Sequence, residues 1–297
     1  MQPTLRSGFV ALVGRSNVGK STLVNRLVGE KVSIACDKPQ TTRNRILGVV
    51  HRPGAQLVLV DLPGVHRSKS RLGEGMNALV RDTLEGIETC CLVVDVAAPA
   101  PREEDRRAAR LVARCDCPRV LVGNKSDLVS EEVATERVGV YAAQGDFVDT
   151  VLVSAETGQG LDRWLECMVQ RMPEGPPYFP EDAVTDQPEQ FLVSELVREQ
   201  ALMHLREEVP HAVAVVIETW QTRPNGMIYI AATLYVERES QKGIVIGAHG
   251  SMLSAIGRAA RAEVERRLGS QVYLEVRVKV KEGWRDRPGS LQTLGYR

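Results

Sequence analysis

The residues with the clearest chemistry stand in one short segment, GRSNVGKS at positions 14–21. A glycine, four residues and then Gly-Lys-Ser is the pattern of a phosphate-binding loop. An apolar run at 9–13 predicts a buried strand before the loop, and 22–27 predicts a helix after it. This order aims backbone N–H groups and a helix N-terminus at one point, where a di- or triphosphate can bind. The alternative is a glycine-rich turn that binds nothing, and the agreement of both flanks argues against it.

The loop supplies both a positive charge and a metal ligand. Lys20 is expected to neutralise the outer phosphates, which makes it a candidate catalytic residue, and the Ser21 hydroxyl is expected to ligate Mg²⁺. The loop residues predicted to bind the nucleotide are Gly14, Asn17, Val18, Gly19, Lys20, Ser21 and Thr22.

Further candidates for the phosphate site lie in two polar segments. The sequence DLPG at 61–64 ends an apolar strand, and there Asp61 can hold Mg²⁺ through water while the Gly64 N–H can bind a γ-phosphate. Thr41 and Thr42 lie in the polar segment 37–44, where a threonine hydroxyl can complete the Mg²⁺ shell. Thr42 is preferred and Thr41 stays open, as does the alternative of two plain loop threonines. The expected metal ligands are therefore Ser21, Thr42 and Asp61, and the expected catalytic residues are Lys20, Thr42 and Gly64.

The segment NKSD at 124–127 predicts which base is bound. Asp127 can accept hydrogen bonds from N1–H and N2–H₂ of guanine, whereas adenine would leave this carboxylate buried without partners. Asn124 can tie the neighbouring loops together, and the stem of Lys125 can cover the base. The segment is expected to select GTP and GDP.

A tripeptide after a later apolar run adds to this prediction. Ser154 and Ala155 follow 150–153, and the Ala155 N–H can meet guanine O6. Alone the tripeptide is weak, but four motifs in this order at strand ends indicate guanine specificity.

Val65 follows Gly64 where many small GTPases place a glutamine that orients water, and valine cannot do this. Slow intrinsic GTP hydrolysis is expected, which would depend on backbone groups, water, a monovalent cation such as K⁺ or a partner.

A second kind of site is predicted near the C-terminus. The glycines of GAHG at 247–250 form a GxxG loop between two helical stretches, which is the signature of a KH domain that clamps single-stranded RNA. The apolar residues 244–246 are expected to line the groove that faces the bases, and Lys242, Arg258 and Arg261 to meet phosphates. The candidate RNA-binding residues are Lys242, Ile244, Gly247, Ala248, His249, Gly250 and Arg258.

The elements that must position these residues fall into two groups. From 9 to about 170, apolar strand-like runs alternate with helical stretches, which predicts a mostly parallel sheet with helices on both faces. Residues 173–190 hold five prolines and five acidic residues, and predict an extended linker. The order helix–strand–strand–helix–helix–strand follows, as in a type II KH domain. The predicted division is a P-loop GTPase domain at 1–172, the linker at 173–190, and an α+β RNA-binding domain with a tail at 191–297.

Composition agrees with two soluble domains. The chain has 297 residues, of which 43% are hydrophobic and 26% charged, and its apolar runs are too short to cross a bilayer. The six cysteines show no CxxC spacing, which favours reduced core residues in the cytosol. Net charge is zero, with an excess of three basic residues in 191–297. That excess permits a polyanionic partner and does not by itself indicate one.

Nearly the whole chain resembles the bacterial Era family of GTPases. The resemblance rests on GRSNVGKS, KPQTTR at 38–43, DLPG, NKSD, SAETGQG at 154–160, IGAHGSMLSAIG at 246–257 and the tail from Lys281 to Tyr296. It implies a monomeric, cytoplasmic GTPase that binds the 3′ end of 16S rRNA and assists 30S maturation, with some peripheral membrane association. It also implies K⁺ binding at Asn17, which is otherwise a plain loop residue.

Two other functions stay open at this point. The first is an RNA-binding protein whose GTPase domain is mainly structural, so that RNA recognition does not depend on the nucleotide. The second is a GTPase acting on another RNA, such as tRNA, and the KH signature argues against it.

Overall fold

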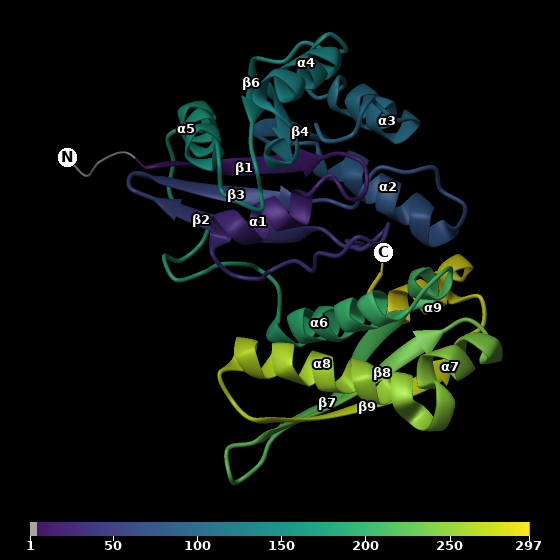
Figure 1. Ribbon diagram of the computed structural model, residues 1–297. Coiled ribbons are helices and arrows are strands. Elements are labelled where there is room, and N and C mark those ends of the chain that lie inside the picture. The colour runs from purple at the N-terminus through teal and green to yellow at the C-terminus, as the bar shows by residue number, and fades with distance from the viewer. Residues whose placement is uncertain (1–4, 297) are drawn as a thin grey trace. The chain divides into compact units, whose positions relative to one another are not determined.

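The structure, a computed structural model, describes residues 5–296. These residues form two compact units (Figure 1). The first comprises 5–35, 42–69 and 73–186, and the second comprises 36–41, 70–72 and 187–296. In this described part of the chain, no helix combines the length and the apolar character that a membrane span requires.

The first unit is built on one six-stranded sheet. Its strands are β1 (Arg6–Val13), β2 (Ile46–Arg52), β3 (Ala55–Asp61), β4 (Thr89–Asp95), β5 (Arg119–Asn124) and β6 (Asp149–Leu152). They stand in the order β2-β3-β1-β4-β5-β6, and every neighbouring pair is parallel except β2 and β3. The carboxyl ends of the parallel strands therefore meet at one edge, where loops gather ligands in folds of this kind.

Helices cover both faces of this sheet. They are α1 (Lys20–Val28), α2 (Arg71–Thr83), α3 (Glu103–Val112), α4 (Glu131–Ala142) and α5 (Leu161–Arg171). Val10 and Leu12 of β1 join a core with α1 and α5, while Ala11 and Val13 join a second core with α2, α3 and α4. Burial of both faces explains why these strands read as continuous apolar runs. The predicted α/β fold is confirmed.

Most of the predicted linker packs on the first unit. The Ser7 hydroxyl donates to the Pro176 carbonyl at 2.7 Å, and the Gln56 amide donates to the Phe179 carbonyl at 2.7 Å. Residues up to Asp186 accordingly group with this unit, so the extended linker expected at 173–190 lies against the first unit over most of its length. The reason is that an extended proline-rich chain keeps its carbonyl acceptors, and β1 and β3 carry side-chain donors beside it.

The second unit has an open three-stranded sheet. Its strands are β7 (Ala214–Thr222), β8 (Ile228–Val236) and β9 (Val272–Val280), and its helices are α6 (Glu189–His204), α7 (Glu239–Ile246), α8 (Ser251–Leu268) and α9 (Pro288–Thr293). β7 pairs antiparallel with β8, and β8 pairs parallel with β9. Apolar residues of α6 and α8, such as Val197 and Ile256, share one core with the sheet. The predicted α+β order of a KH domain is confirmed.

Single-turn 3-10 helices complete both units. They are η1 (Ser126–Leu128), η2 (Val209–Ala212), η3 (Ala248–Gly250) and η4 (Trp284–Asp286). Two of them carry predicted motifs, since η1 holds the end of NKSD and η3 holds most of the GxxG loop.

Candidate functional site

The phosphate-binding loop joins β1 to α1 and is packed so closely that its glycines cannot be replaced freely. Gly19 has φ 97°, and a Cβ there would lie 2.2 Å from Nδ2 of Asn124. A Cβ on Gly14 would lie 2.3 Å from the carbonyl oxygen of Val93. Asn17 is exposed and takes φ 64°. The loop conformation is therefore set by its neighbours as well as by its own residues.

Lys20 begins α1 and turns back across the loop. Its Nζ donates to the carbonyl oxygens of Gly14 at 3.1 Å and Arg15 at 2.9 Å. Burial lowers the pKa of Lys20 to about 8, and the nearby Asp61 carboxylate opposes that shift. A buried ammonium gains when a phosphate binds beside it, because the phosphate supplies the missing negative charge. Ser21 and Thr22 follow in the first turn of the same helix.

Hydroxyl and carboxylate oxygens converge at the first turn of α1. Ser21 donates to Oδ2 of Asp61 at 2.6 Å, and Ser33 donates to the same oxygen at 2.7 Å. The other oxygen of Asp61, Oδ1, is buried and has no hydrogen-bond partner within the described residues 5–296. Burial raises the pKa of this carboxyl, while Lys20 pulls it down. Hard oxygen ligands around an unsatisfied carboxylate fit Mg²⁺. Ser33 was missed from the sequence, where nothing distinguishes it from other loop serines.

The two threonines of the polar segment have different surroundings. Oγ1 of Thr42 lies 2.9 Å from Oγ of Ser21, beside the Asp61 carboxylate. Oγ1 of Thr41 instead donates to the Lys38 carbonyl at 2.6 Å, within its own loop. Of the two hydroxyls, Thr42 therefore shares the oxygen cluster with Ser21.

The DLPG segment lies directly on the phosphate-binding loop. A Cβ on Gly64 would lie 2.6 Å from the backbone nitrogen of Ser16. The Val65 N–H donates to the Gly14 carbonyl at 3.0 Å, and the Val65 side chain is buried in the core shared with α2. A side chain held in this core cannot orient a water molecule, as the sequence predicts for a valine.

Asn124 connects three loops at the end of β5. Its Nδ2 donates to the Val18 carbonyl at 2.7 Å, and its Oδ1 accepts from the Ala155 N–H at 2.9 Å. The Ala155 N–H is thus engaged by Asn124, whereas the sequence assigns it to guanine O6. Ser154 is fully buried, and its hydroxyl accepts from the Thr157 N–H at 3.0 Å. The side-chain amide reaches both loops because parallel β1, β5 and β6 end at one edge of the sheet.

Lys125 and Asp127 flank the turn of the NKSD motif. Lys125 takes φ 66°, and Asp127 is exposed on η1, where its carboxylate is open to a ligand. The Lys125 Nζ donates to Oδ2 of Asp95 at 2.8 Å. This contact fixes the stem of the lysine at the edge of the base-binding loop.

Arg15 forms a buried ion-pair network that the sequence does not reveal. Its guanidinium lies 3.2 Å from both Asp95 and Asp105, and its side chain is 8% exposed. Asp95 ends β4 and Asp105 lies in the first turn of α3, so the partners are 80 and 90 residues away. The only available signal was an acidic residue at the end of an apolar strand, which is common in this kind of fold.

The GxxG loop of the second unit has three residues at positive φ. These are Gly247 at 73°, His249 at 50° and Gly250 at 79°. A Cβ on Gly247 would also lie 2.7 Å from Cβ of Met252, whereas nothing lies within 4 Å of one on Gly250. Ala248 and His249 are exposed. The loop therefore offers open backbone to a ligand.

The side chains around this loop agree only partly with the expected groove. Ile244 is 50% exposed, but Val245 is fully buried in the core, so its predicted place in the groove is wrong. The reason is that the 3.6-residue period of α7 points neighbouring side chains to different faces. Lys242 lies 3.8 Å from Glu239, and Arg258 is exposed on α8.

Two family comparisons agree with these two units. Residues 9–125 match the family described as 50S ribosome-binding GTPase, and residues 208–285 match the KH domain. The chain is 46% identical over 291 residues to GTPase Era of Geotalea uraniireducens (strain Rf4), which covers 98% of both chains. It is 44% identical over 292 residues to GTPase Era of Heliobacterium modesticaldum, covering 98% of this chain and 97% of that one.

Solved structures agree over the same length. One is a crystal structure of Era in complex with MgGDPNP and nucleotides 1506–1542 of 16S ribosomal RNA. Another is an Aquifex aeolicus Era variant bound to GDP·AlF4⁻. Each has a TM-score of 0.94 and 37% identity, and covers 98% of this chain and 99% of the other.

Proposed function

This chain belongs to the Era family of GTPases, and we propose that it binds the 3′ end of 16S rRNA and assists maturation of the 30S subunit. In this proposal GTP binding and hydrolysis set how tightly the KH domain holds RNA. The observation that carries it is the full-length similarity to an Era structure that holds both a GTP analogue and this RNA.

The nucleotide contacts follow from the geometry of the first unit. Backbone N–H groups of 14–22 surround the phosphates, Lys20 neutralises the outer ones, and Asp127 accepts from the guanine edge. Lys20 exchanges its two carbonyl acceptors for phosphate oxygens when the nucleotide enters. Asn124 acts by holding the Val18 and Ala155 loops together.

Ser21, Thr42 and Asp61 are the residues that would hold Mg²⁺, with Ser33 orienting Asp61. Bound there, Mg²⁺ supplies charge neutralisation at the β- and γ-phosphate oxygens. Thr42 belongs to a loop that changes its position when the γ-phosphate is lost, and the Gly64 N–H senses the same group. These two residues couple the nucleotide state to the surface of the protein.

Hydrolysis is slow because the residue directly after Gly64 is Val65, whose side chain cannot orient water. We propose that K⁺ bound at Asn17 supplies part of the missing positive charge beside the phosphates. GTP turnover measured in KCl and in NaCl at equal ionic strength tests this, with Asn17→Ala as the variant. A faster rate in KCl that Asn17→Ala abolishes is expected, and equal rates in all four conditions would exclude a K⁺ site.

The RNA contacts are assigned to the open face of the GxxG loop. The backbone of 247–250 approaches RNA phosphates, Ile244 contacts bases, and Lys242 and Arg258 supply charge. A cytoplasmic location is inferred from this RNA partner, and a monomer is expected. Peripheral membrane association rests on the family resemblance alone, and fractionation of cells before and after a high-salt wash tests it.

The central experiment compares RNA binding in two nucleotide states. Binding of an RNA with the 3′ end of 16S rRNA is measured with GDP and with a non-hydrolysable GTP analogue. A difference of tenfold or more, about 1.4 kcal/mol, is expected for a switch. Equal affinity would favour the alternative in which the GTPase unit is structural, and crosslinking that recovers tRNA without rRNA would favour a tRNA factor.

The structure also decides which variant should serve as the RNA-binding control. Gly247→Asp would place a carboxylate at the loop, but its Cβ would collide with Met252 at positive φ. Ala248→Asp puts the same charge on an exposed residue whose φ is not positive. It is expected to abolish RNA binding and leave GDP affinity unchanged, because Ala248 belongs to the second unit and the nucleotide-binding residues belong to the first.

A further inference from the structure

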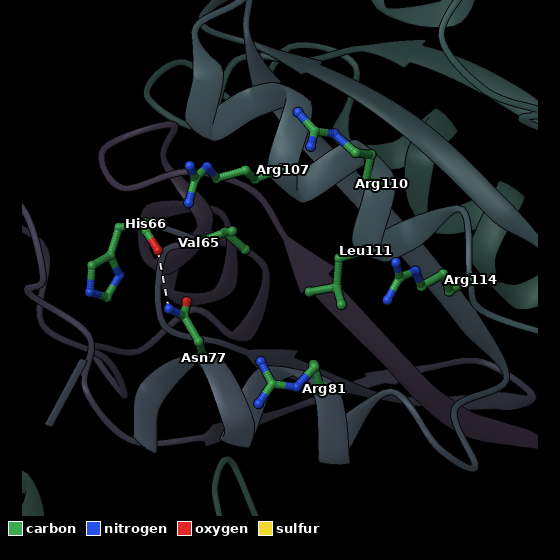
Figure 2. A pocket seen from close by; sticks show the side chains of 8 residues that line it. All are labelled: Val65, His66, Asn77, Arg81, Arg107, Arg110, Leu111 and Arg114. Carbon is green, nitrogen blue, oxygen red and sulfur yellow. Dashed lines mark hydrogen bonds between the residues drawn. The ribbon is translucent and has the colours of Figure 1, made fainter. Parts of the chain in front are cut away.

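A cavity of about 280 Å³ lies between α2 and α3 of the first unit, beside the segment that follows Gly64 (Figure 2). Among residues 5–296, four arginines line it and no acidic residue does. The lining residues are Val65, His66, Asn77, Arg81, Arg107, Arg110, Leu111 and Arg114. None of the residues assigned above to the nucleotide lines this cavity, although Val65 directly follows Gly64.

Three of the arginines share one face of the polypeptide around α3. Arg107, Arg110 and Arg114 are spaced by three and four residues, which brings their side chains to the same side of a helix. Arg81 extends from α2 on the other side of the cavity (Figure 2). At 1.5 Å per residue the row from Arg107 to Arg114 spans about 10 Å, which is longer than one phosphate group.

The positive charge of this arginine pocket is not balanced by the protein. Arg107 and Arg110 share a single carboxylate, that of Glu103, at 3.4 and 3.1 Å. Arg81 and Arg114 form no ion pair with any residue between 5 and 296. Glu85 and Asp116 line a neighbouring cavity that shares these two arginines, and neither comes within ion-pair distance of them. Converging guanidinium groups repel one another, so binding of an anion lowers the free energy of the pocket.

The guanidinium groups of this pocket, and the length of about 10 Å over which they are arranged, suit a ligand with several phosphates in a chain. A guanidinium binds phosphate oxygens through two parallel hydrogen bonds, and Arg is enriched where phosphate is recognised. On the basis of the proposed function, the geometry points to a second RNA-binding site, in which Arg81, Arg107, Arg110 and Arg114 hold consecutive backbone phosphates of ribosomal RNA. The contacts are to the RNA backbone, so they add affinity without reading sequence.

The pocket adjoins the γ-phosphate sensor through short hydrogen bonds. Asn77 of α2 donates to the His66 carbonyl at 3.1 Å, and Nδ1 of His66 lies 2.9 Å from the Gly64 carbonyl oxygen. RNA held against α2 and α3 therefore touches the segment that carries Gly64. Loss of the γ-phosphate removes a hydrogen-bond acceptor of the Gly64 N–H, so the segment that follows Gly64 can change its position. The affinity of the second RNA site therefore depends on the bound nucleotide.

The test removes the two arginines that have no ion-pair partner. Arg81→Gln/Arg114→Gln is compared with wild type and with Arg106→Gln, a control on α3 that is 54% exposed and does not line the pocket. Affinity for protein-free 16S rRNA and for 30S subunits is measured across a range of salt concentrations with a GTP analogue bound. GDP affinity and thermal unfolding confirm that each variant is folded.

Loss of two phosphate contacts is expected to make the plot of the logarithm of the binding constant against the logarithm of the salt concentration shallower. The negative slope should decrease in magnitude by about 2, for rRNA and for 30S subunits alike. The control should keep the slope of the wild type.

If the double variant keeps that slope too, while Ala248→Asp still abolishes binding, the arginine pocket is not an RNA site and the proposed function stands. If wild type binds neither rRNA nor 30S subunits, the proposed function itself fails. Weaker binding to 30S subunits with unchanged binding to rRNA would assign the pocket to an acidic protein surface and overturn the proposal.

Discussion

Lys125 donates a 2.8 Å hydrogen bond to Asp95, the last residue of β4. The same carboxylate oxygen accepts from Arg15 of the phosphate-binding loop at 3.2 Å. One oxygen therefore joins the base-binding loop to the loop that surrounds the phosphates. Asp95 thus links both halves of the nucleotide site, although it is not itself one of the residues expected to bind the nucleotide.

Asp95→Asn tests this connection. The amide keeps the shape of the side chain but loses the charge that pairs with the buried Arg15 and the partly buried Lys125, so we expect a loss of about 1–3 kcal/mol in stability. GDP affinity should fall by at least tenfold, measured by fluorescence titration. Asp162→Asn is the control, because Asp162 pairs with Arg52 at the surface and its side chain is 89% exposed. Equal GDP affinity in both variants would contradict a positioning role for Asp95.

Val65→Gln should fail to create a faster GTPase. The Val65 side chain is 8% exposed within the core, and its N–H is already bonded to the Gly14 carbonyl. Burying an amide there without partners should cost about 1–3 kcal/mol of stability. Single-turnover GTP hydrolysis and thermal unfolding measure the two effects. A rate above that of wild type would mean that this side chain can reach the water molecule after all.

Gly64→Ala should separate hydrolysis from nucleotide binding. The new Cβ would lie within 2.7 Å of Ser16 backbone atoms, so DLPG must move away from the phosphate-binding loop. We expect hydrolysis to fall more than tenfold, about 1.4 kcal/mol in the barrier, while GDP affinity stays within threefold. In Gly139→Ala, the matched control on α4, the new Cβ meets nothing within 4 Å. That control should keep wild-type activity, and a fully active Gly64→Ala would exclude close packing as the reason for this glycine.

Trp284→Phe tests what anchors the tail of the second unit. The indole Nε1 donates to the Ala212 carbonyl at 2.9 Å, and the ring stacks on Tyr296 with centroids 5.5 Å apart. Phenylalanine keeps the stack but leaves the buried carbonyl without its donor, for an expected loss of about 1–3 kcal/mol. Urea unfolding followed by circular dichroism measures it. Tyr273→Phe, on a side chain that is 52% exposed, should cost nothing, and equal losses in the two variants would argue against the buried hydrogen bond.

The sequence by itself determined the parts of this protein that depend on neighbouring residues. GRSNVGKS between an apolar run and a helix predicts a phosphate-binding loop, because the glycine spacing and both flanking elements are local features of the chain. Alternation of strands and helices fixed the α/β class, and the GxxG loop in its helix–strand order fixed the KH domain. The motifs also indicated guanine, since guanine offers the N1–H and N2–H₂ donors that the Asp127 carboxylate can accept and adenine does not.

Tertiary structure decided everything that depends on which strands lie side by side. Asp95 meets Arg15 and Lys125 only because β1, β4 and β5 are neighbours in the sheet. The same packing engages the Ala155 N–H with Asn124, and it gathers arginines from α2 and α3 into one pocket. No short-range pattern encodes these contacts, because hydrogen-bonded partners such as Arg15 and Asp95 are 80 residues apart and meet through the order of the strands. The sequence thus determined the local chemistry of each loop, and the packing of the sheet decided which loops act together.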